Sequence, residues 1–322
     1  MTMAEVPHER VLVYDRIGSN KRSTILLMLG FIVFTALFFT ALATIIGYYA
    51  DPSADIHSDT VIRIAIAAAL IATGVGVIMY YASTAAVLLI SGGHEVTKEE
   101  EPELYRIVEN LSIGSGLPMP HVWVVEDPAP NAFATGRNPQ LAHVAATRGL
   151  MDKLDKRELQ AVMAHEMSHV GNYDTRMMTT VAVVVGLTAL IADLLLRFTF
   201  YGSGSRSSNR DKGNGATQII LVIAIIFVII SPIIATIMQL ALSRQREYLA
   251  DASGVLLNRD PDALADALEK ISADPTPLQH ANKATAPLYI TNPLTEHGSF
   301  LNNLFNTHPP IQERIKILRA MG

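Results

Sequence analysis

Two histidines four residues apart, His165 and His169, are the side chains in this sequence best suited to binding a metal ion. On an α-helix, residues four positions apart lie on the same face, so two such imidazoles can reach one cation. Glu166 lies between them in the pattern His-Glu-Met-Ser-His. This is the HExxH pattern, in which two histidines bind Zn²⁺ and the glutamate is the general base for a water molecule. The pattern therefore predicts metal-assisted chemistry on a helix.

The residues around this pattern predict a regular helix. Asp155 can serve as its N-cap, with Glu158 three residues later completing a capping box. Apolar residues then recur at helical spacing, and Gly171 suits the C-terminus. Both histidines are therefore expected on one helix. The alternative is a pair of solvated histidines on an amphipathic helix that binds no metal.

A third metal ligand must come from elsewhere in the chain, because catalytic zinc usually takes three protein ligands and leaves one position for water. The chain has no cysteine, which leaves His, Asp and Glu. The best candidate is Glu247, with Asp251 four residues later on the same helical face. Asp251 would then accept a hydrogen bond from the far nitrogen of a ligating histidine. The alternative is an interfacial helix in which both carboxylates pair with Arg244 and Arg246.

The composition is typical of an integral membrane protein. Of 322 residues, 50% are hydrophobic and 17% are charged, and the mean hydropathy is +0.29. Four apolar stretches are each about as long as the roughly 20 residues needed to cross a bilayer: 25–50, 61–90, 177–196 and 216–242. The first two predict N-terminal transmembrane helices, and the last two predict a second helical hairpin. A net charge of −5 argues against nucleic acid as a partner.

The charges around short loops predict the orientation. Lys21 and Arg22 are among four basic residues before the first stretch, whereas the connector 51–60 has none. The N-terminus is therefore expected in the cytoplasm, with the catalytic domain on the cytoplasmic side of the cell membrane. Because the HExxH pattern precedes the third stretch and Glu247 follows the fourth, a shared metal site needs both stretches to cross, or neither. Basic residues in the connector between these stretches oppose a full crossing.

The expected fold is mainly α-helical with a small β-sheet. We divide the chain into an N-terminal tail with two transmembrane helices (1–91), the first part of a zincin-like α+β catalytic domain (92–176), the third and fourth hydrophobic helices with their connector (177–243), and the second part of the catalytic domain (244–322). Within the catalytic domain, residue patterns predict a helix from Pro102, strands at 121–125 and 141–146, and an amphipathic helix at 311–319.

With these segments in this order, the chain resembles the HtpX family of membrane zinc metalloproteases, which are gluzincins related to the CAAX prenyl proteases. The features that carry the resemblance are Asn131-Ala132-Phe133-Ala134-Thr135-Gly136, the HExxH helix, Arg244-x-x-Glu247-x-x-x-Asp251, and His308-Pro309-Pro310 followed by Arg314.

The resemblance implies one Zn²⁺ per chain, bound by His165, His169 and Glu247. It implies that Glu166 is the catalytic base. From the ligand types alone, Mn²⁺, Co²⁺ and Fe²⁺ stay open as alternatives, because sites with two histidines and one glutamate accept several metals.

The resemblance also assigns roles to residues outside the two metal-binding segments. Asp251 and Arg314 would support the site, Asn131 would contact the substrate backbone, and His308 would stabilise the oxyanion. Judged from the residues alone, Asn131 holds a turn after Pro130, and His308 simply precedes the start of the last helix.

The function implied by the resemblance is that of a zinc-dependent metalloendopeptidase acting in protein quality control on membrane or misfolded proteins. The expected partners are therefore polypeptide substrates and the lipid bilayer. An extended peptide is expected to pair with a strand edge near 141–146. Two alternatives stay open: a processing protease for lipidated peptides, and a non-catalytic membrane scaffold or transporter whose His/Glu cluster only stores metal.

Overall fold

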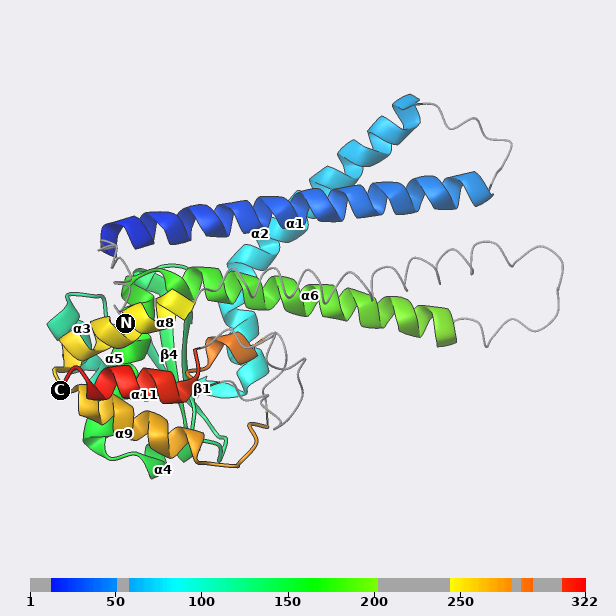
Figure 1. Cartoon of the computed structure of the whole chain (residues 1–322). Coiled ribbons are helices and arrows are strands. Elements are labelled where there is room, and N and C mark those ends of the chain that lie inside the picture. Colours follow the sequence, from blue (N-terminus) through cyan, green and yellow to red (C-terminus); the bar gives the residue numbers. More distant parts are fainter. Residues whose placement is uncertain (1–12, 51–57, 202–243, 280–284, 292–308) are drawn as a thin grey trace, which may run out of the picture.

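Two long apolar helices, α1 (Val13–Ala50) and α2 (Ser58–Ser91), precede the domain that contains the sheet (Figure 1). The computed structural model describes residues 13–50, 58–201, 244–279, 285–291 and 309–322. Gly18–Ala41 and Asp59–Ser91 are long and apolar enough to cross a membrane, and only 6% and 11% of their most apolar windows are buried. Such exposed apolar surface is suited to lipid. The prediction of two N-terminal transmembrane helices is confirmed.

The third apolar stretch lies within helix α6 (Asp174–Tyr201), which begins at the domain, packs against α1 and extends away from the domain (Figure 1). Helix α8 (Arg244–Asn258) lies in the domain again. The predicted fourth hydrophobic helix, 216–242, lies outside the described residues.

A four-stranded mixed sheet forms the centre of the domain. Its strands are β1 (Gly93–Glu95), β2 (His121–Val125), β3 (Ala132–Gly136) and β4 (Ala142–Thr147), in the order β1-β2-β4-β3. β2 and β4 are parallel, and the two outer pairs are antiparallel. The two predicted strands are confirmed to within one residue. All five residues of β3 are buried, so this strand shows no alternation of polar and apolar residues by which it could be predicted.

Strand β4 is internal to the sheet. Val144 pairs with Val122 on one side and with Ala134 on the other. The expectation that a peptide pairs with an edge near 141–146 is therefore wrong, because both rows of backbone hydrogen-bonding groups are already used. The outer strand on this side is β3, where Phe133 forms a bridge with Tyr289.

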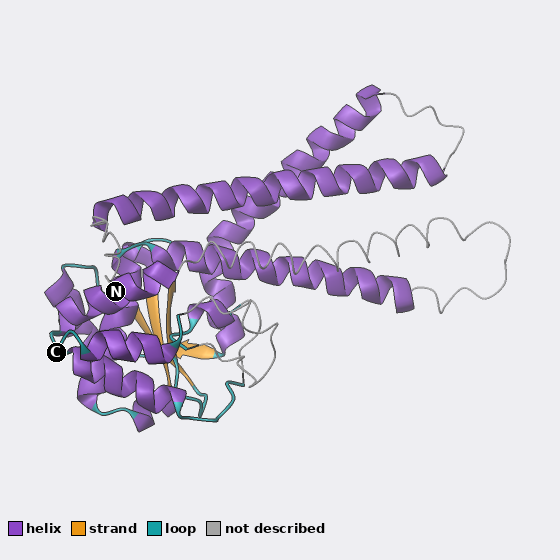
Figure 2. Ribbon diagram, viewed as in Figure 1, coloured by secondary structure: helices purple, strands orange, loops and turns teal. Residues whose placement is uncertain are grey.

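Each face of the sheet contributes to a separate hydrophobic cluster. On one face, Val122 and Val144 pack with residues of α3 (Pro102–Ser115), α5 (Lys156–Gly171) and α9 (Pro261–Ser272). On the other face, Val125, Phe133 and Ala145 pack with residues of α2 and α6. The sheet therefore lies between α5, the helix that bears the HExxH pattern, and the long helices α2 and α6 (Figure 2).

The last helix, α11 (Ile311–Arg319), packs on α9, as the amphipathic pattern at 311–319 predicts. Leu318 of α11 shares the cluster that contains α5, so residues almost 150 positions apart belong to one core. Helix α9 itself was not predicted. Within the described residues, the other short elements are α4 (Arg148–Lys153) and two 3-10 turns, η1 (Pro139–Leu141) and η3 (Ala286–Leu288).

Candidate metal centre

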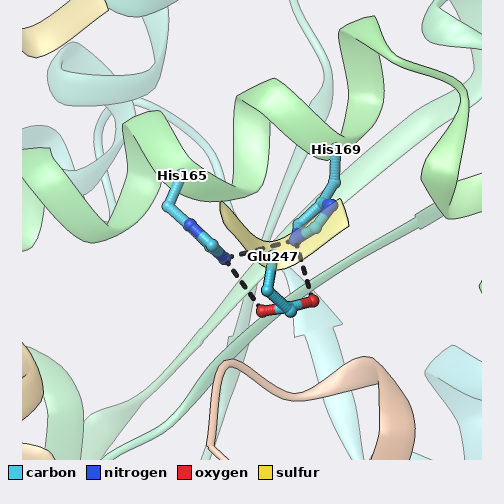
Figure 3. A group of neighbouring side chains, drawn as sticks. All are labelled: His165, His169 and Glu247. Carbon is cyan, nitrogen blue, oxygen red and sulfur yellow. Dashed lines mark hydrogen bonds and ion pairs between the residues drawn. The ribbon is translucent and has the colours of Figure 1, made fainter. Parts of the chain in front are cut away.

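Three buried side chains meet at one point: His165 and His169 from α5, and Glu247 from α8 (Figure 3). The Nε2 atoms of the two histidines are 3.2 Å apart. Oxygens of the Glu247 carboxylate lie 3.8 Å from Nε2 of His165 and 3.7 Å from Nε2 of His169. Two nitrogens bound tetrahedrally to one zinc ion would lie ~3.3 Å apart. The donor types and their spacing therefore fit a tetrahedral metal ion.

Helix α5 holds both histidines in the core. The Asp155 side chain accepts a hydrogen bond from the backbone N–H of Glu158 (2.9 Å), and the Glu158 side chain accepts one from the backbone N–H of Asp155 (2.8 Å). This confirms the predicted capping box, and the helix ends at Gly171 as expected. His165 and His169 are 0% and 4% exposed. The alternative of two solvated histidines is therefore wrong.

Helix α8 approaches α5 closely enough to bring Glu247 to the histidines. The two helices lie close together at Gly254, where an added Cβ would lie 3.1 Å from both the Cα and the backbone nitrogen of His165. Glu247 is seven residues, about two helical turns, before this glycine and lies on the same side of α8. A residue without a side chain at 254 thus sets the distance between the two metal-binding segments.

Asp251 and Arg314 form a buried pair behind His165. Oδ1 of Asp251 lies 2.9 Å from Nδ1 of His165. The Arg314 guanidinium donates to both Asp251 oxygens, at 2.9 and 2.7 Å, and its Nη1 lies 3.4 Å from Glu247. Burial raises the pKa of Asp251, but the charge of Arg314 and the interactions with His165 together outweigh burial and lower this pKa to about 2. An ionised carboxylate therefore faces the nitrogen of His165 that points away from the metal position.

Asp174 has the corresponding position behind His169. Its Oδ2 lies 3.1 Å from Nδ1 of His169, and the carboxylate is 1% exposed. Burial by itself lowers the pKa of His169, yet Asp174 and Glu247 raise it to about 9, so the surroundings strongly favour positive charge at this point. Sequence reasoning missed Asp174. The available signal was a carboxylate five residues after His169, directly before the third apolar stretch.

Glu166 is buried beside the histidines, with 1% of its surface exposed. Burial is the main cause of a pKa raised to about 7, and the neighbouring Glu247 carboxylate raises it further. The charges of His169 and Arg314 act in the opposite direction. A carboxyl group that titrates near neutral pH is well matched to accepting and returning a proton.

Asn131 borders β3 and holds a later segment of the chain. Its Nδ2 donates to the carbonyl of Thr291 at 3.1 Å, and its Oδ1 accepts from the backbone N–H of Ala132 at 3.1 Å. The N–H of Ile290 donates to the Ala132 carbonyl at 3.0 Å, so residues 289–291 lie along β3. Contact of Asn131 with a substrate stays a prediction. His308 lies outside the described residues.

Comparisons with known proteins agree on one family. A model of peptidase family M48 matches residues 98–322. Proteins described as "Protease HtpX homolog" are 44% identical over 309 residues in Dictyoglomus turgidum (96% of this chain and 95% of that protein) and 41% identical over 316 residues in Listeria monocytogenes serotype 4a (96% and 100%). The Tropheryma whipplei strain Twist relative is 47% identical over 253 residues, covering 79% of this chain and 84% of its own.

Among solved structures, the crystal structure of S. mikatae Ste24p is similar, with a TM-score of 0.47 and 18% sequence identity. The match covers 95% of this chain and 66% of that chain.

Proposed function

The chain belongs to peptidase family M48, and we propose that it is a zinc-dependent endopeptidase that cleaves membrane or misfolded proteins at the cytoplasmic face of the cell membrane. Its family makes it a membrane metallopeptidase. The observation that carries the proposal is the buried cluster of His165, His169 and Glu247 with Glu166 beside it. Peptide hydrolysis by a metal site needs such a pairing of a Lewis acid with a base in a place shielded from bulk water.

Zinc suits this donor set. Two imidazoles and one carboxylate are a known catalytic zinc set, with a fourth position left for water or substrate. When bound there, zinc supplies a Lewis acid for the scissile carbonyl and for the attacking water. His165 and His169 would hold it through Nε2 and Glu247 through its carboxylate. Asp251 and Asp174 face the two Nδ1 atoms, which keeps the Nε2 lone pairs directed at the metal.

Glu166 would move the proton in the reaction. As a carboxylate, it takes a proton from the attacking water while the water oxygen forms a bond to the scissile carbonyl carbon. The same carboxyl group then gives the proton to the leaving amine as the C–N bond breaks, so the enzyme ends as it began. Its pKa, raised by burial to about 7, makes both transfers accessible near neutral pH. His308 would donate a hydrogen bond to the oxyanion.

The position of the site favours substrates in or near the membrane. The same domain that carries the metal cluster continues into α1, α2 and α6. The basic residues Lys21 and Arg22 at the start of the first stretch support a cytoplasmic location for this domain. Backbone recognition would involve Asn131 and the part of β3 beyond Phe133, because Ala132 and Phe133 are already paired with residues 289–291. Recognition of this kind gives broad sequence selectivity. Such selectivity suits the removal of damaged or misfolded polypeptides.

The experiment that tests the proposal is cleavage of casein, an unfolded polypeptide, by the full-length protein purified in detergent. The protein is assayed as purified, after chelation, and after return of zinc. Glu166→Gln is assayed in parallel, with Glu313→Gln as the matched control, because Glu313 is exposed on α11 and undergoes the same chemical change. We expect the activity of the unmodified protein to disappear on chelation and to recover with zinc. With zinc bound, Glu166→Gln should be inactive and Glu313→Gln should be as active as the unmodified protein.

Two outcomes would contradict the proposal. Substantial cleavage by zinc-loaded Glu166→Gln would remove Glu166 as the base. Tight zinc binding with no cleavage of casein, but with cleavage of a prenylated peptide and not of its unmodified copy, would favour processing of lipidated peptides instead.

A further inference from the structure

Asn20, a polar residue near the start of the first membrane helix, reaches the loop next to the metal site. It is buried, and its Nδ2 donates to Oδ1 of Asp174 at 2.7 Å and to the carbonyl of Asn172 at 2.9 Å. These partners are more than 150 positions away in the sequence. Because the amide is removed from water, both contacts occupy a donor that would otherwise be left unsatisfied.

The Asp174 carboxylate connects this amide with a predicted metal ligand. Oδ1 accepts from Asn20, and Oδ2 lies 3.1 Å from Nδ1 of His169. The bond from Asn20 of α1 therefore helps to orient the Asp174 carboxylate, and this orientation in turn affects the position of the His169 imidazole. A histidine whose Nδ1–H is held by a carboxylate presents its Nε2 lone pair in a fixed direction. Nε2 of His169 is the atom that faces His165 and Glu247.

The loop that carries Asp174 also depends on α1 for its shape. Tyr173 has a φ of 60°, in the left-handed region that costs most non-glycine residues about 1 kcal/mol or more. Such a turn persists only where its surroundings hold it. Here the neighbouring Asn172 carbonyl is bonded by Asn20, and Nζ of Lys21 lies 4.2 Å from the centre of the Tyr173 ring. Two consecutive residues of α1 thus clamp the turn between α5 and α6.

We propose that Asn20 is a positioning residue of the metal centre, which acts through Asp174 to hold His169 in its metal-binding orientation. The first membrane helix is then a component of the metal site as well as an anchor. The inference rests on the proposed function only in requiring that the site binds zinc. The competing explanation is that Asn20 merely fastens α1 to the domain. That explanation predicts a loss of thermal stability without any effect on the metal.

The test measures zinc retention by the full-length protein in detergent micelles. Protein loaded with one equivalent of zinc is mixed with a chromophoric chelator, and the rate of zinc loss is followed. Three single variants are compared: Asn20→Ala; Asn20→Asp, which keeps the size of the side chain; and Asp174→Asn. A double variant combines Asp174→Asn with Asn20→Ala. Thr24→Val is the control, because Thr24 is buried one turn later and its hydroxyl donates only to the Asn20 carbonyl of its own helix, at 2.8 Å.

We expect zinc loss to be about 10-fold faster in Asn20→Ala, at the low end of the 10- to 100-fold effects seen when the partner of a ligand is removed. Asn20→Asp replaces the donor with a second carboxylate facing Asp174 and should lose zinc at least as fast. Thr24→Val should match the unmodified protein. In the Asp174→Asn background, Asn20→Ala should add nothing, since its effect passes through that carboxylate. The visible absorption spectrum of the Co²⁺-loaded protein should change in the Asn20 variants, because it reports the geometry of the ligands.

Two results separate failure of this inference from failure of the proposed function. If the unmodified protein binds no zinc, the metal centre and this inference fall together. If the unmodified protein and both Asn20 variants retain zinc equally, with unchanged Co²⁺ spectra and only a lower unfolding temperature, the inference alone is refuted. Additive effects of Asn20→Ala and Asp174→Asn would also refute it.

Discussion

Replacing Gly254 with alanine is expected to weaken the metal centre by moving α8 away from α5. The new Cβ would lie 3.1 Å from the Cα and the backbone nitrogen of His165, inside the ~3.5–4.0 Å of ordinary carbon contacts. These atoms belong to a helix backbone in a close-packed core, so they cannot rotate aside. We therefore expect α8 to shift outward by roughly 0.5 Å to restore a normal contact.

Glu247 would move with α8, because both residues lie on one helix. Its oxygens are already 3.7 and 3.8 Å from the Nε2 atoms of the histidines, so an outward shift takes them beyond the reach of a shared metal ion. Forcing an extra methyl group into a packed core typically costs about 1–3 kcal/mol. If most of this cost is taken from the free energy of zinc binding, zinc affinity falls by roughly 5- to 150-fold, since about 1.4 kcal/mol corresponds to a factor of ten.

The assay is competition for zinc against a chelator of known affinity, followed by casein cleavage at limiting zinc. Gly114→Ala is the matched control: Gly114 is also within a helix, α3, but its added Cβ would meet only the end of the Leu257 side chain, at 3.4 Å. Both variants gain the same helix propensity of about 1 kcal/mol, so the difference between them isolates the contact with His165. Unchanged zinc affinity in Gly254→Ala would refute the view that this glycine sets the helix spacing.

Four further predictions concern the surroundings of the site. Arg314→Leu should lower the thermal stability of the metal-free protein by about 3–5 kcal/mol, because it leaves buried Asp251 and Glu247 without their cation; a melting temperature equal to that of the unmodified protein would contradict this. Glu166 must be ionised to accept a proton, so kcat/KM should fall as the pH drops below about 7, with a midpoint at or below this value in the zinc-loaded enzyme because a cation lowers the pKa. Burial raises the pKa of Glu166 from 4.5 to about 7, so between these pH values the folded metal-free protein holds a proton on Glu166 that the unfolded chain has lost, and its stability falls as the pH rises from 4.5 to about 7. Glu166→Gln removes this carboxyl group and should therefore raise the melting temperature at pH 8 and much less at pH 5. Equal increases at the two pH values would disprove the raised pKa of Glu166. Asp155→Ala removes the capping box of α5 and should cost about 1 kcal/mol of stability in thermal unfolding, whereas no change would show that the tertiary contacts alone hold this end of the helix.

Features that arise from neighbouring residues were predictable. The capping box at Asp155 and Glu158, and the helix at 311–319, follow from i to i+3 and i to i+4 relations. The two N-terminal membrane helices follow from uninterrupted apolar length. The grouping of His165, His169 and Glu247 was also within reach, because few residue types bind zinc and the chain lacks cysteine.

Features that depend on pairing between distant segments were not predictable. Strand β3 is buried on both faces, so its residues give no alternating pattern, and β4 was taken for an edge although β3 covers it. Asp174 follows a left-handed turn at Tyr173, and no local rule directs its carboxylate toward His169. Its partner Asn20 is on a different helix, among residues whose composition indicates only a membrane anchor.

By itself, the sequence determined the kind of protein, with its N-terminal membrane helices, and predicted the chemistry: a metal-binding helix, a base beside it and a third ligand of carboxylate type. These depend on residue types and short spacings, which survive in any fold that keeps the helices. Only the tertiary structure decided how the ligands are held. The close approach at Gly254, the carboxylates behind the two histidines and the contact from Asn20 each join residues that the chain brings together only when the core forms. Such contacts depend on packing across the whole domain, which no local pattern encodes.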